Sequence, residues 1–446
     1  MKQMFATVLA LAFAMLGQAQ AQDQAMRYTA LVNGGKDKAG HMVITRRGEK
    51  YLVDFLFKDN GRGPELKEEY TLAPDGTFAT YKVKGATTFG SLVDESFSRK
   101  GDQARWKSTS DKGEEAVSGT AIYSPLNGTP QAFSVALTAL ARSGGKLPMI
   151  PSGTLTQRKL LDMDVSRGSE KRRVQLLALT GVGFTPTTVW ATTGDAPRLF
   201  AYIYPGQLQL IEEGWQSNAA DMEAKQVVAE KELLVDFNKR LTHALPGTTL
   251  IRNARVFDSE QATLGGPTDV LIEAGRIIEV TPSGAITRKA DRVIDAANRV
   301  LLPGLFDMHT HVGFWDGGLQ VGAGVTTIRD MGNDNPTLLE LMKQEEAGTL
   351  LMPRVVPAGF IEGESPHASR SGFVVKNLEE AKKAVDWYHS NGFPQIKIYN
   401  SFPKDILSET TEYAHTKGMR VSGHIPVHLR AEEAVIAGYD EIQHIN

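Results

Sequence analysis

The stretch that decides the fold is "LPGLFDMHTHVG", residues 302–313, in which His309 and His311 follow an apolar run. On a β-strand, residues i and i+2 share one face about 6.5–7 Å apart, so the two imidazoles could approach one ion together. On a helix the same spacing would splay them apart. Ten histidines in 446 residues give roughly a one-in-five chance of such a pair somewhere. The motif alone therefore leaves open whether this is a metal site or two neighbouring polar residues.

From Leu302 onward, short apolar runs alternate with helical patterns. Asn335-Pro336 opens one expected helix and Gly348 closes it, while Asn377 to Glu380 opens another that ends at Gly392. This alternation predicts parallel strands joined by right-handed crossovers, in either a barrel or an open sheet. The expected strands are "GLFDMHTH", "VTTIRDMG", "RVVPAGF", "QIKIYN", "MRVSGHIP" and "DEIQHIN".

Three more side chains with metal-binding chemistry fall on these expected strands. Lys397 lies in "QIKIYN", His424 in "VSGHIP" and His444 in "EIQHIN", each at or near a strand's carboxyl end. Barrel active sites are built at that end. A buried lysine is costly unless it is paired or altered, and a lone histidine is usually a hydrogen-bonded core residue. Four strands that deliver His-x-His, Lys, His and His in order favour one shared site.

Other polar residues are weaker candidates for the same site. Tyr399 shares a strand face with Lys397 and could bind a substrate carboxylate, although core packing explains it equally well. His367 follows the third expected strand and could contact substrate, but a surface-loop histidine is the simpler interpretation. Asp330 ends the second expected strand and is expected to hydrogen-bond to residues that bind the metal.

The quoted strands resemble the amidohydrolase superfamily of metal-dependent hydrolases, over about residues 250–446. The closest subgroup contains the imidazolonepropionase-like proteins and the Xaa-Pro dipeptidase (prolidase-like) enzymes. The resemblance implies a (β/α)8 TIM-like barrel beside a small β-sandwich. It rests on "LIRNARVFD", "DVLIEAGRIIEV", "VLLPGLFDMHTHVG", "GVTTIRDMG", "IKIY", "GHIP" and "AVIAGYDEIQHIN".

The resemblance also implies a cofactor, two divalent metal ions that are usually zinc. His309 and His311 match the strand-one ligands of the first ion, and His424 and His444 match the ligands of the second. Lys397 matches the strand-four lysine, which is carboxylated by CO2 in many members and bridges both ions. A metal-activated hydroxide would then cleave a C–N amide bond.

The implied substrates are small molecules or dipeptides, with Xaa-Pro dipeptides as the leading class. Cyclic amides or lactones hydrolysed at the same site are the first alternative. A non-catalytic periplasmic binding or scaffold protein with a degenerate barrel is the second. The sequence leaves the substrate, the metal and the oligomeric state open.

One departure from the family concerns its catalytic aspartate. The family places an Asp at the end of strand eight, where it binds the first metal and shuttles the proton. This sequence ends at Asn446, directly after the sixth expected strand. We therefore expect an incomplete barrel, a fragment of a longer enzyme, with its catalytic residue unassigned.

The sequence before residue 302 divides into four parts. Residues 1–21, "MKQMFATVLALAFAMLGQAQA", read as a signal peptide that predicts a periplasmic or secreted protein. Residues 22–216 alternate apolar and polar positions, which predicts an antiparallel β-rich domain: a support or interaction module, or alternatively a cup for an apolar ligand. Residues 217–246 are an expected helical connector, residues 247–301 the partial β-sandwich, and residues 302–446 the incomplete barrel.

Composition excludes several other classes of protein. The formal net charge is −3 with no long basic stripe, so we expect no nucleic-acid partner. No segment reaches the ~20 consecutive apolar residues that a membrane span needs. The chain has no cysteine, which excludes disulfides and thiolate metal ligands. A metal here must be held by histidine, carboxylate or modified lysine.

Overall fold

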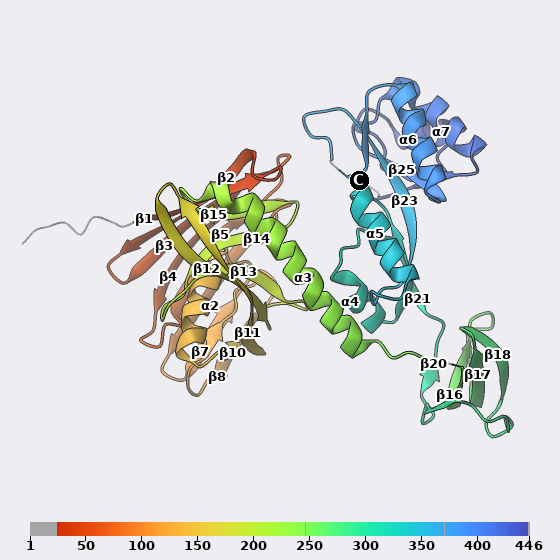
Figure 1. Ribbon diagram of the computed structural model, residues 1–446, viewed down its shortest axis with the longest axis horizontal. Coiled ribbons are helices and arrows are strands. Elements are labelled where there is room, and N and C mark those ends of the chain that lie inside the picture. Colours follow the sequence, from red (N-terminus) through yellow and green to blue (C-terminus); the bar gives the residue numbers. More distant parts are fainter. Residues whose placement is uncertain (1–24, 246, 370, 445–446) are drawn as a thin grey trace, which may run out of the picture. The chain divides into compact units, whose positions relative to one another are not determined.

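A computed structural model describes residues 25–245, 247–369 and 371–444 (Figure 1). The chain divides into two compact units, of which one ends at Glu230 and the other begins at Lys231. The expected signal peptide, residues 1–21, lies outside the described residues. None of the helices in the described ranges is long and apolar enough to cross a membrane.

The N-terminal unit is built on one 15-stranded sheet, with β1 paired to β2 on one side and to β15 on the other. Neighbouring strands are antiparallel except for the parallel pair β9 and β10. The strands are β1 (Ala25–Val32), β2 (Asp37–Arg47), β3 (Lys50–Phe57), β4 (Glu65–Leu72), β5 (Phe78–Ala86), β6 (Leu92–Lys100), β7 (Gln103–Lys107), β8 (Lys112–Ala116), β9 (Ile122–Tyr123), β10 (Lys146–Ile150), β11 (Thr154–Arg167), β12 (Glu170–Thr180), β13 (Thr187–Thr192), β14 (Leu199–Tyr204) and β15 (Leu208–Glu212).

Helix α2 (Gln131–Arg142) lies within the region that the sequence predicted to be β-rich, and the sequence analysis did not predict it. Its apolar residues, including Leu137 and Leu140, are buried in the same core as Tyr81 and Val83 of β5. A second core contains Trp190, Phe200 and Trp215. It also takes in the start of α3 (Ala219–Leu241), which follows the short helix η1 (Gln216–Asn218). Side chains of α2 therefore share one core with residues of the sheet.

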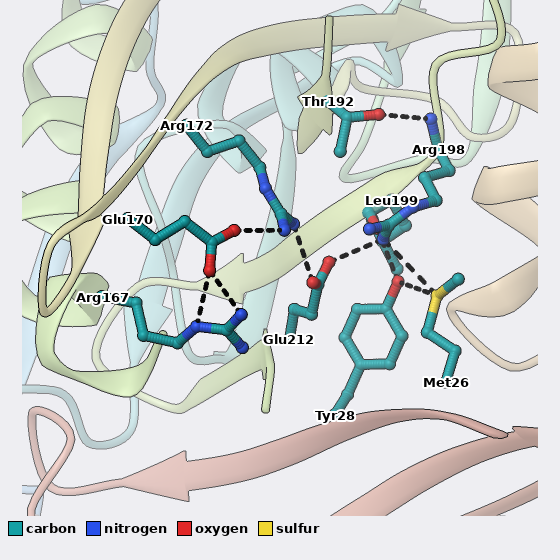
Figure 2. A network of polar contacts seen from close by, with 9 residues as sticks. All are labelled: Met26, Tyr28, Arg167, Glu170, Arg172, Thr192, Arg198, Leu199 and Glu212. Atoms are coloured by element: carbon teal, nitrogen blue, oxygen red, sulfur yellow. Dashed lines mark hydrogen bonds and ion pairs between the residues drawn. The ribbon is translucent and has the colours of Figure 1, made fainter. Parts of the chain in front are cut away.

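A half-buried charge network joins β12, β15 and Arg198, the residue directly before β14 (Figure 2). Glu212 contacts Arg172 Nη1 and Arg198 Nη1, each at 2.7 Å. The Arg172 guanidinium also lies 4.5 Å from the centre of the Trp215 ring. Burial by itself would raise the pKa of Glu212, but the hydrogen bonds from Arg198 and Arg172 outweigh it and hold that pKa below its ordinary value.

The C-terminal unit contains a small sheet in the order β18-β17-β16-β19, with β20 also paired to β16. Leu250, Leu271 and Ile286 form its core. Its strands are β16 (Thr248–Asp258), β17 (Thr263–Glu273), β18 (Arg276–Pro282), β19 (Arg292–Asp295) and β20 (Val300–Leu301).

A parallel sheet in the order β21-β22-β23-β25-β26-β27 follows, with β24 beside β23. Its strands are β21 (Leu305–Thr310), β22 (Val325–Asp330), β23 (Arg354–Gly363), β24 (Phe373–Val375), β25 (Gln395–Ile398), β26 (Arg420–Gly423) and β27 (Glu441–Ile442). The helices of this region are α4 (Asp316–Gly322), α5 (Asn335–Glu346), α6 (Leu378–Ser390), η2 (Lys404–Ile406), α7 (Leu407–Thr416) and α8 (Ala431–Ile436).

The helix boundaries follow the signals in the sequence. Asn377 caps α6 because its side chain accepts a hydrogen bond from Glu380 N. Gly348 and Gly392 end their helices with φ of 64° and 78°, a backbone conformation that glycine adopts without strain. The predicted alternation of parallel strands and helices after Leu302 is confirmed.

The parallel sheet curls but does not close into a barrel within the described residues. Arg329 on β22 and Glu441 on β27 make two contacts of 2.7 Å, although three strands separate β22 from β27 in the sheet. Strands lie about 4.8 Å apart, so in a flat sheet this pair would be about 19 Å apart. The contact therefore requires curvature.

The charge network of the N-terminal unit generates a stability prediction. Glu212→Gln removes the carboxylate that contacts Arg198 and leaves Arg172 with its longer contact to Glu170, at 3.2 Å. It should lower the free energy of unfolding by about 1.5–3 kcal/mol at pH 7. Because the folded pKa of Glu212 lies below 4.5, its contribution is full above pH 4.5 and is lost as the pH falls through the folded value. The difference between wild type and variant should shrink accordingly.

Urea unfolding at pH 7 and in the acid range measures both effects. Glu213→Gln is the matched control, because Glu213 is the neighbouring residue and is exposed. Equal unfolding free energies for the two variants at pH 7 would contradict the assigned role of Glu212.

Candidate functional site

The predicted site residues lie at the carboxyl ends of four parallel strands. His309 is on β21, and His311 follows the end of that strand by one residue. Lys397 is on β25, and His424 comes directly after β26. His444 follows β27 by two residues with a φ of 67°, a left-handed conformation that residues other than glycine seldom adopt. Parallel strands bring all of these side chains to one edge of the sheet.

The structure brings these five side chains together. The ring of His309 lies 5.4 Å from that of His311 and 4.6 Å from that of His444, measured between ring centres. The ring centres of His424 and His444 are 4.8 Å apart. Lys397 Nζ lies 3.5 Å from His309 Nε2. His311 and His444 are exposed and Lys397 is buried, so the cluster is open on one side.

The two predicted substrate residues differ in their placement. Tyr399 belongs to the cluster, because its ring centre lies 4.2 Å from that of His424 and 5.7 Å from Lys397 Nζ. His367 is exposed in the loop after β23, and its backbone N–H donates to Ser365 Oγ. Within the described residues, no contact joins His367 to the cluster.

Three histidines of the cluster are held through Nδ1. The Nδ1 atom of His311 lies 2.6 Å from the carbonyl oxygen of Gly332. That of His309 lies 2.7 Å from Gln443 Oε1, and that of His424 lies 2.8 Å from Asn400 Oδ1. An oxygen acceptor at Nδ1 places the proton there and leaves the lone pair on Nε2, as is usual for metal-binding histidines.

Burial disfavours the charged ammonium form of Lys397. It is 1% exposed, and burial lowers its pKa to about 8, with Asp330 raising it and Arg329 lowering it further. Burial also lowers the pKa of His309, and Lys397 adds to that effect. A neutral amine is the form that reacts with CO2, so the setting of Lys397 suits carboxylation.

Asp330 holds the backbone on both sides of His311. It is fully buried and accepts hydrogen bonds from Val312 N at 2.8 Å and from Gly332 N at 2.9 Å. Val312 follows His311 directly, and the carbonyl of Gly332 is the Nδ1 partner of that histidine. Asp330 therefore fixes the position of His311 without contacting its ring.

The sequence analysis missed four residues that support the site: Asn400, Arg329, Glu441 and Gln443. The Arg329 guanidinium holds both oxygens of Glu441 and donates from Nε to Met308 O at 2.7 Å. Hydrogen bonds from Arg329 lower the pKa of Glu441. Glu441 and Gln443 flank Ile442 in the sequence, a period-two spacing at the end of β27 that could have drawn attention to them.

The chemistry of the cluster suits the two metal ions that the fold family implies, although its present geometry does not define a site. Within residues 25–444, apart from the undescribed positions 246 and 370, no three His, Asp or Glu side chains are placed to hold an ion. The imidazoles would supply the nitrogen ligands that zinc accepts. Imidazole donors carry no negative charge, so a carboxylated Lys397 would add an anionic oxygen ligand to the set.

Comparisons with known proteins identify relatives over part of the chain. No family model matches the sequence. It is 37% identical over 99 residues to a dihydroorotase from Pediococcus pentosaceus, covering 20% of this chain and 22% of the relative. It is 37% identical over 91 residues to a 5-methylthioadenosine/S-adenosylhomocysteine deaminase from Desulforudis audaxviator, covering 20% and 18%. It is 35% identical over 75 residues to an imidazolonepropionase from Salmonella typhimurium, covering 16% and 18%.

The overlap with solved structures is also partial. A Xaa-Pro dipeptidase with bound methionine is 20% identical, with a TM-score of 0.38 over 44% of this chain and 61% of that one. A molinate hydrolase is 18% identical, with a TM-score of 0.36 over 45% and 58%. Likeness at this level does not establish a shared fold.

The sequence matches carry the assignment. The chain spans about a fifth of the length of the curated relatives it matches, from 18% to 22% in the three named above. Those partial matches, together with the motif that contains His309 and His311, support the resemblance to the amidohydrolase superfamily.

Proposed function

We propose that this protein is a metal-dependent hydrolase that cleaves C–N amide bonds. The observation that carries the proposal is the convergence of four histidines and one buried lysine at the carboxyl edge of a parallel sheet. Three of those histidines are held at Nδ1 by oxygen atoms, which directs Nε2 to a ligand. Two divalent ions held there, zinc by donor preference, would make a hydroxide at neutral pH and polarise the scissile carbonyl.

In this proposal each side chain has a separate task. His309 and His311 would hold the first ion, and His424 and His444 would hold the second. The neutral Nζ of Lys397 would form a bond to the carbon of CO2, one C=O bond would become C–O⁻, and Nζ would lose a proton; the resulting carbamate would offer anionic oxygen to the metal site. The negative charge of the carbamate offsets part of the positive charge of the ions.

The substrate class of the proposal is a small amide, with Xaa-Pro dipeptides first. Tyr399 is half-buried beside His424, where its hydroxyl would meet a substrate carboxylate. Cyclic amides and lactones would use the same residues, and they remain the alternative. A periplasmic or secreted location belongs to the proposal as well, as do the domain boundaries expected from the sequence.

We also propose that the curled sheet forms six strands of a (β/α)8 barrel. The Arg329–Glu441 contact is evidence of the curvature that a barrel needs. Edge strand β21 also exposes large apolar side chains that a barrel would cover: Leu305, Phe306 and Met308 are 56%, 66% and 53% exposed. The rival to this proposal is a non-catalytic binding or scaffold protein, which would have no use for the metal ligands.

Removal of first-ion ligands is the first test of the proposal. His309→Ala and His311→Ala should each weaken zinc binding by at least about 100-fold, because losing a direct ligand costs more than losing the supporting contacts of one. Competition with a chromophoric chelator measures the affinity. His389→Ala, on the exposed face of α6, is the control and should bind as the wild type does. Unchanged zinc affinity in both site variants would refute the proposed site.

Carboxylation of Lys397 has its own spectroscopic test. Protein prepared with 13C-bicarbonate should show one carbamate carbon resonance by NMR, and Lys397→Ala should lose that resonance and bind at most one zinc ion per chain. Lys397→Glu, which brings its own carboxylate, should bind two. Lys404→Ala is the control, since Lys404 is exposed and pairs with Glu433. A resonance that survives in Lys397→Ala would show that the carbamate forms elsewhere.

A substrate panel separates the proposed activities. Zinc-loaded protein would be assayed with Xaa-Pro dipeptides, lactams and lactones. We expect hydrolysis of Xaa-Pro dipeptides, and the rate should fall at least about 100-fold in His311→Ala. Turnover of lactams or lactones alone would replace the dipeptidase proposal with its alternative. Tight zinc binding without turnover of any of the three classes would favour the non-catalytic rival.

A further inference from the structure

We propose that Gln443 is a positioning residue that sets the tautomer and orientation of His309, and that the Arg329–Glu441 ion pair sets Gln443 in turn. The inference rests on the proposed function, because His309 needs a lone pair on Nε2 only if it binds a metal. The observations behind it are hydrogen bonds that link Arg329 on β22, Glu441 on β27 and His309 on β21 through Gln443.

Arg329 immobilises the carboxylate of Glu441. Arg329 is 8% exposed, and its Nη1 and Nη2 atoms each lie 2.7 Å from one oxygen of Glu441. A third bond from Arg329 Nε to Met308 O ties the same guanidinium to β21. Two parallel N–H···O bonds fix a carboxylate in both position and rotation.

The second step is the polarity of the Gln443 amide. Its Nε2 atom donates a hydrogen bond to Glu441 Oε1. An ionised carboxylate accepts hydrogen bonds but cannot donate them, so the NH2 side of the amide must face Glu441. The amide oxygen is thereby turned toward His309, with Oε1 at 2.7 Å from Nδ1. Repulsion between two acceptors opposes the reversed amide.

The third step is the proton on His309. An amide oxygen can only accept, so His309 must carry its proton on Nδ1, and its lone pair is on Nε2. Nε2 faces Lys397 Nζ at 3.5 Å, inside the cluster. A reversed amide would place an N–H at Nδ1, move the ring proton to Nε2 and remove the lone pair from the proposed metal.

The side chain of Gln443 is not needed to hold its strand in place. The backbone N–H of Gln443 donates to Gly423 O at 2.7 Å, and that bond does not depend on the side chain. Gln443→Met keeps the backbone bond and most of the side-chain volume, and it removes only the amide. Glu441→Gln removes the carboxylate that dictates the amide's polarity, but it also leaves Arg329 unpaired, so Gln443→Met is the cleaner variant.

The test reads the two nitrogen atoms of His309 in the metal-free 446-residue chain labelled with 15N-histidine. NMR chemical shifts should show the Nδ1–H tautomer for His309 in the wild type and a mixture of tautomers in Gln443→Met. His311 is the internal control, because the backbone carbonyl of Gly332 fixes its tautomer in both proteins. Gln344→Met is the matched control, since Gln344 also donates to a glutamate, Glu340, on α5 away from the cluster.

A second readout is the zinc affinity of the same proteins. We expect Gln443→Met to bind zinc about 10–100-fold more weakly than wild type and Gln344→Met, because supporting contacts of metal ligands typically contribute that much. A wild-type His309 that carries its proton on Nε2 would overturn the inference, as would unchanged His309 shifts in Gln443→Met. If the tautomers behave as expected but the wild type binds no zinc, the positioning role of Gln443 is supported and the proposed function fails.

Discussion

The Arg329–Glu441 ion pair is the constraint on which the C-terminal unit depends. Three strands separate its partners in the sheet, and the two side chains together reach little more than half the distance that a flat sheet would put between them. Both of its contacts are 2.7 Å long. The sheet must therefore curl, and the curl brings the end of β27 to the end of β21. Without it His444 and Gln443 would not meet His309.

The same curvature accounts for the electrostatics of the cluster. It encloses Lys397 among the strand ends, where burial lowers the pKa of the amine to about 8. The donors that surround Lys397 are neutral imidazoles, so two divalent ions would lack anionic ligands unless the lysine itself becomes one. The buried carboxylate of Asp330 does not fill that role, because its oxygens accept hydrogen bonds from Val312 N and Gly332 N. The proposed carbamate on Lys397 would supply the anionic ligand, and the bound ions would offset its buried charge.

Local signals predicted the secondary structure well, because capping and turn residues act within a few positions. Asn377, Gly348 and Gly392 mark helix ends in the sequence and in the structure. Helix α2 was missed because its short apolar stretch stands among strands with similar composition, and its burial against the sheet is a tertiary effect. The closeness of the histidines and Lys397 could be inferred from strand ends. The contact between Gln443 and His309 could not be inferred from the sequence, because the two residues are 134 positions apart and their contact depends on the curvature of the sheet.

Anomalous diffraction at the zinc edge, from crystals of the chain grown with zinc, tests the central claim most directly. The account predicts two strong peaks beside Lys397, one of them about 2.0–2.1 Å from Nε2 of both His309 and His311. Density for a carbamate should link Lys397 to both peaks. Zinc bound through Nδ1 of these histidines, or found only at surface positions away from Lys397, would contradict it.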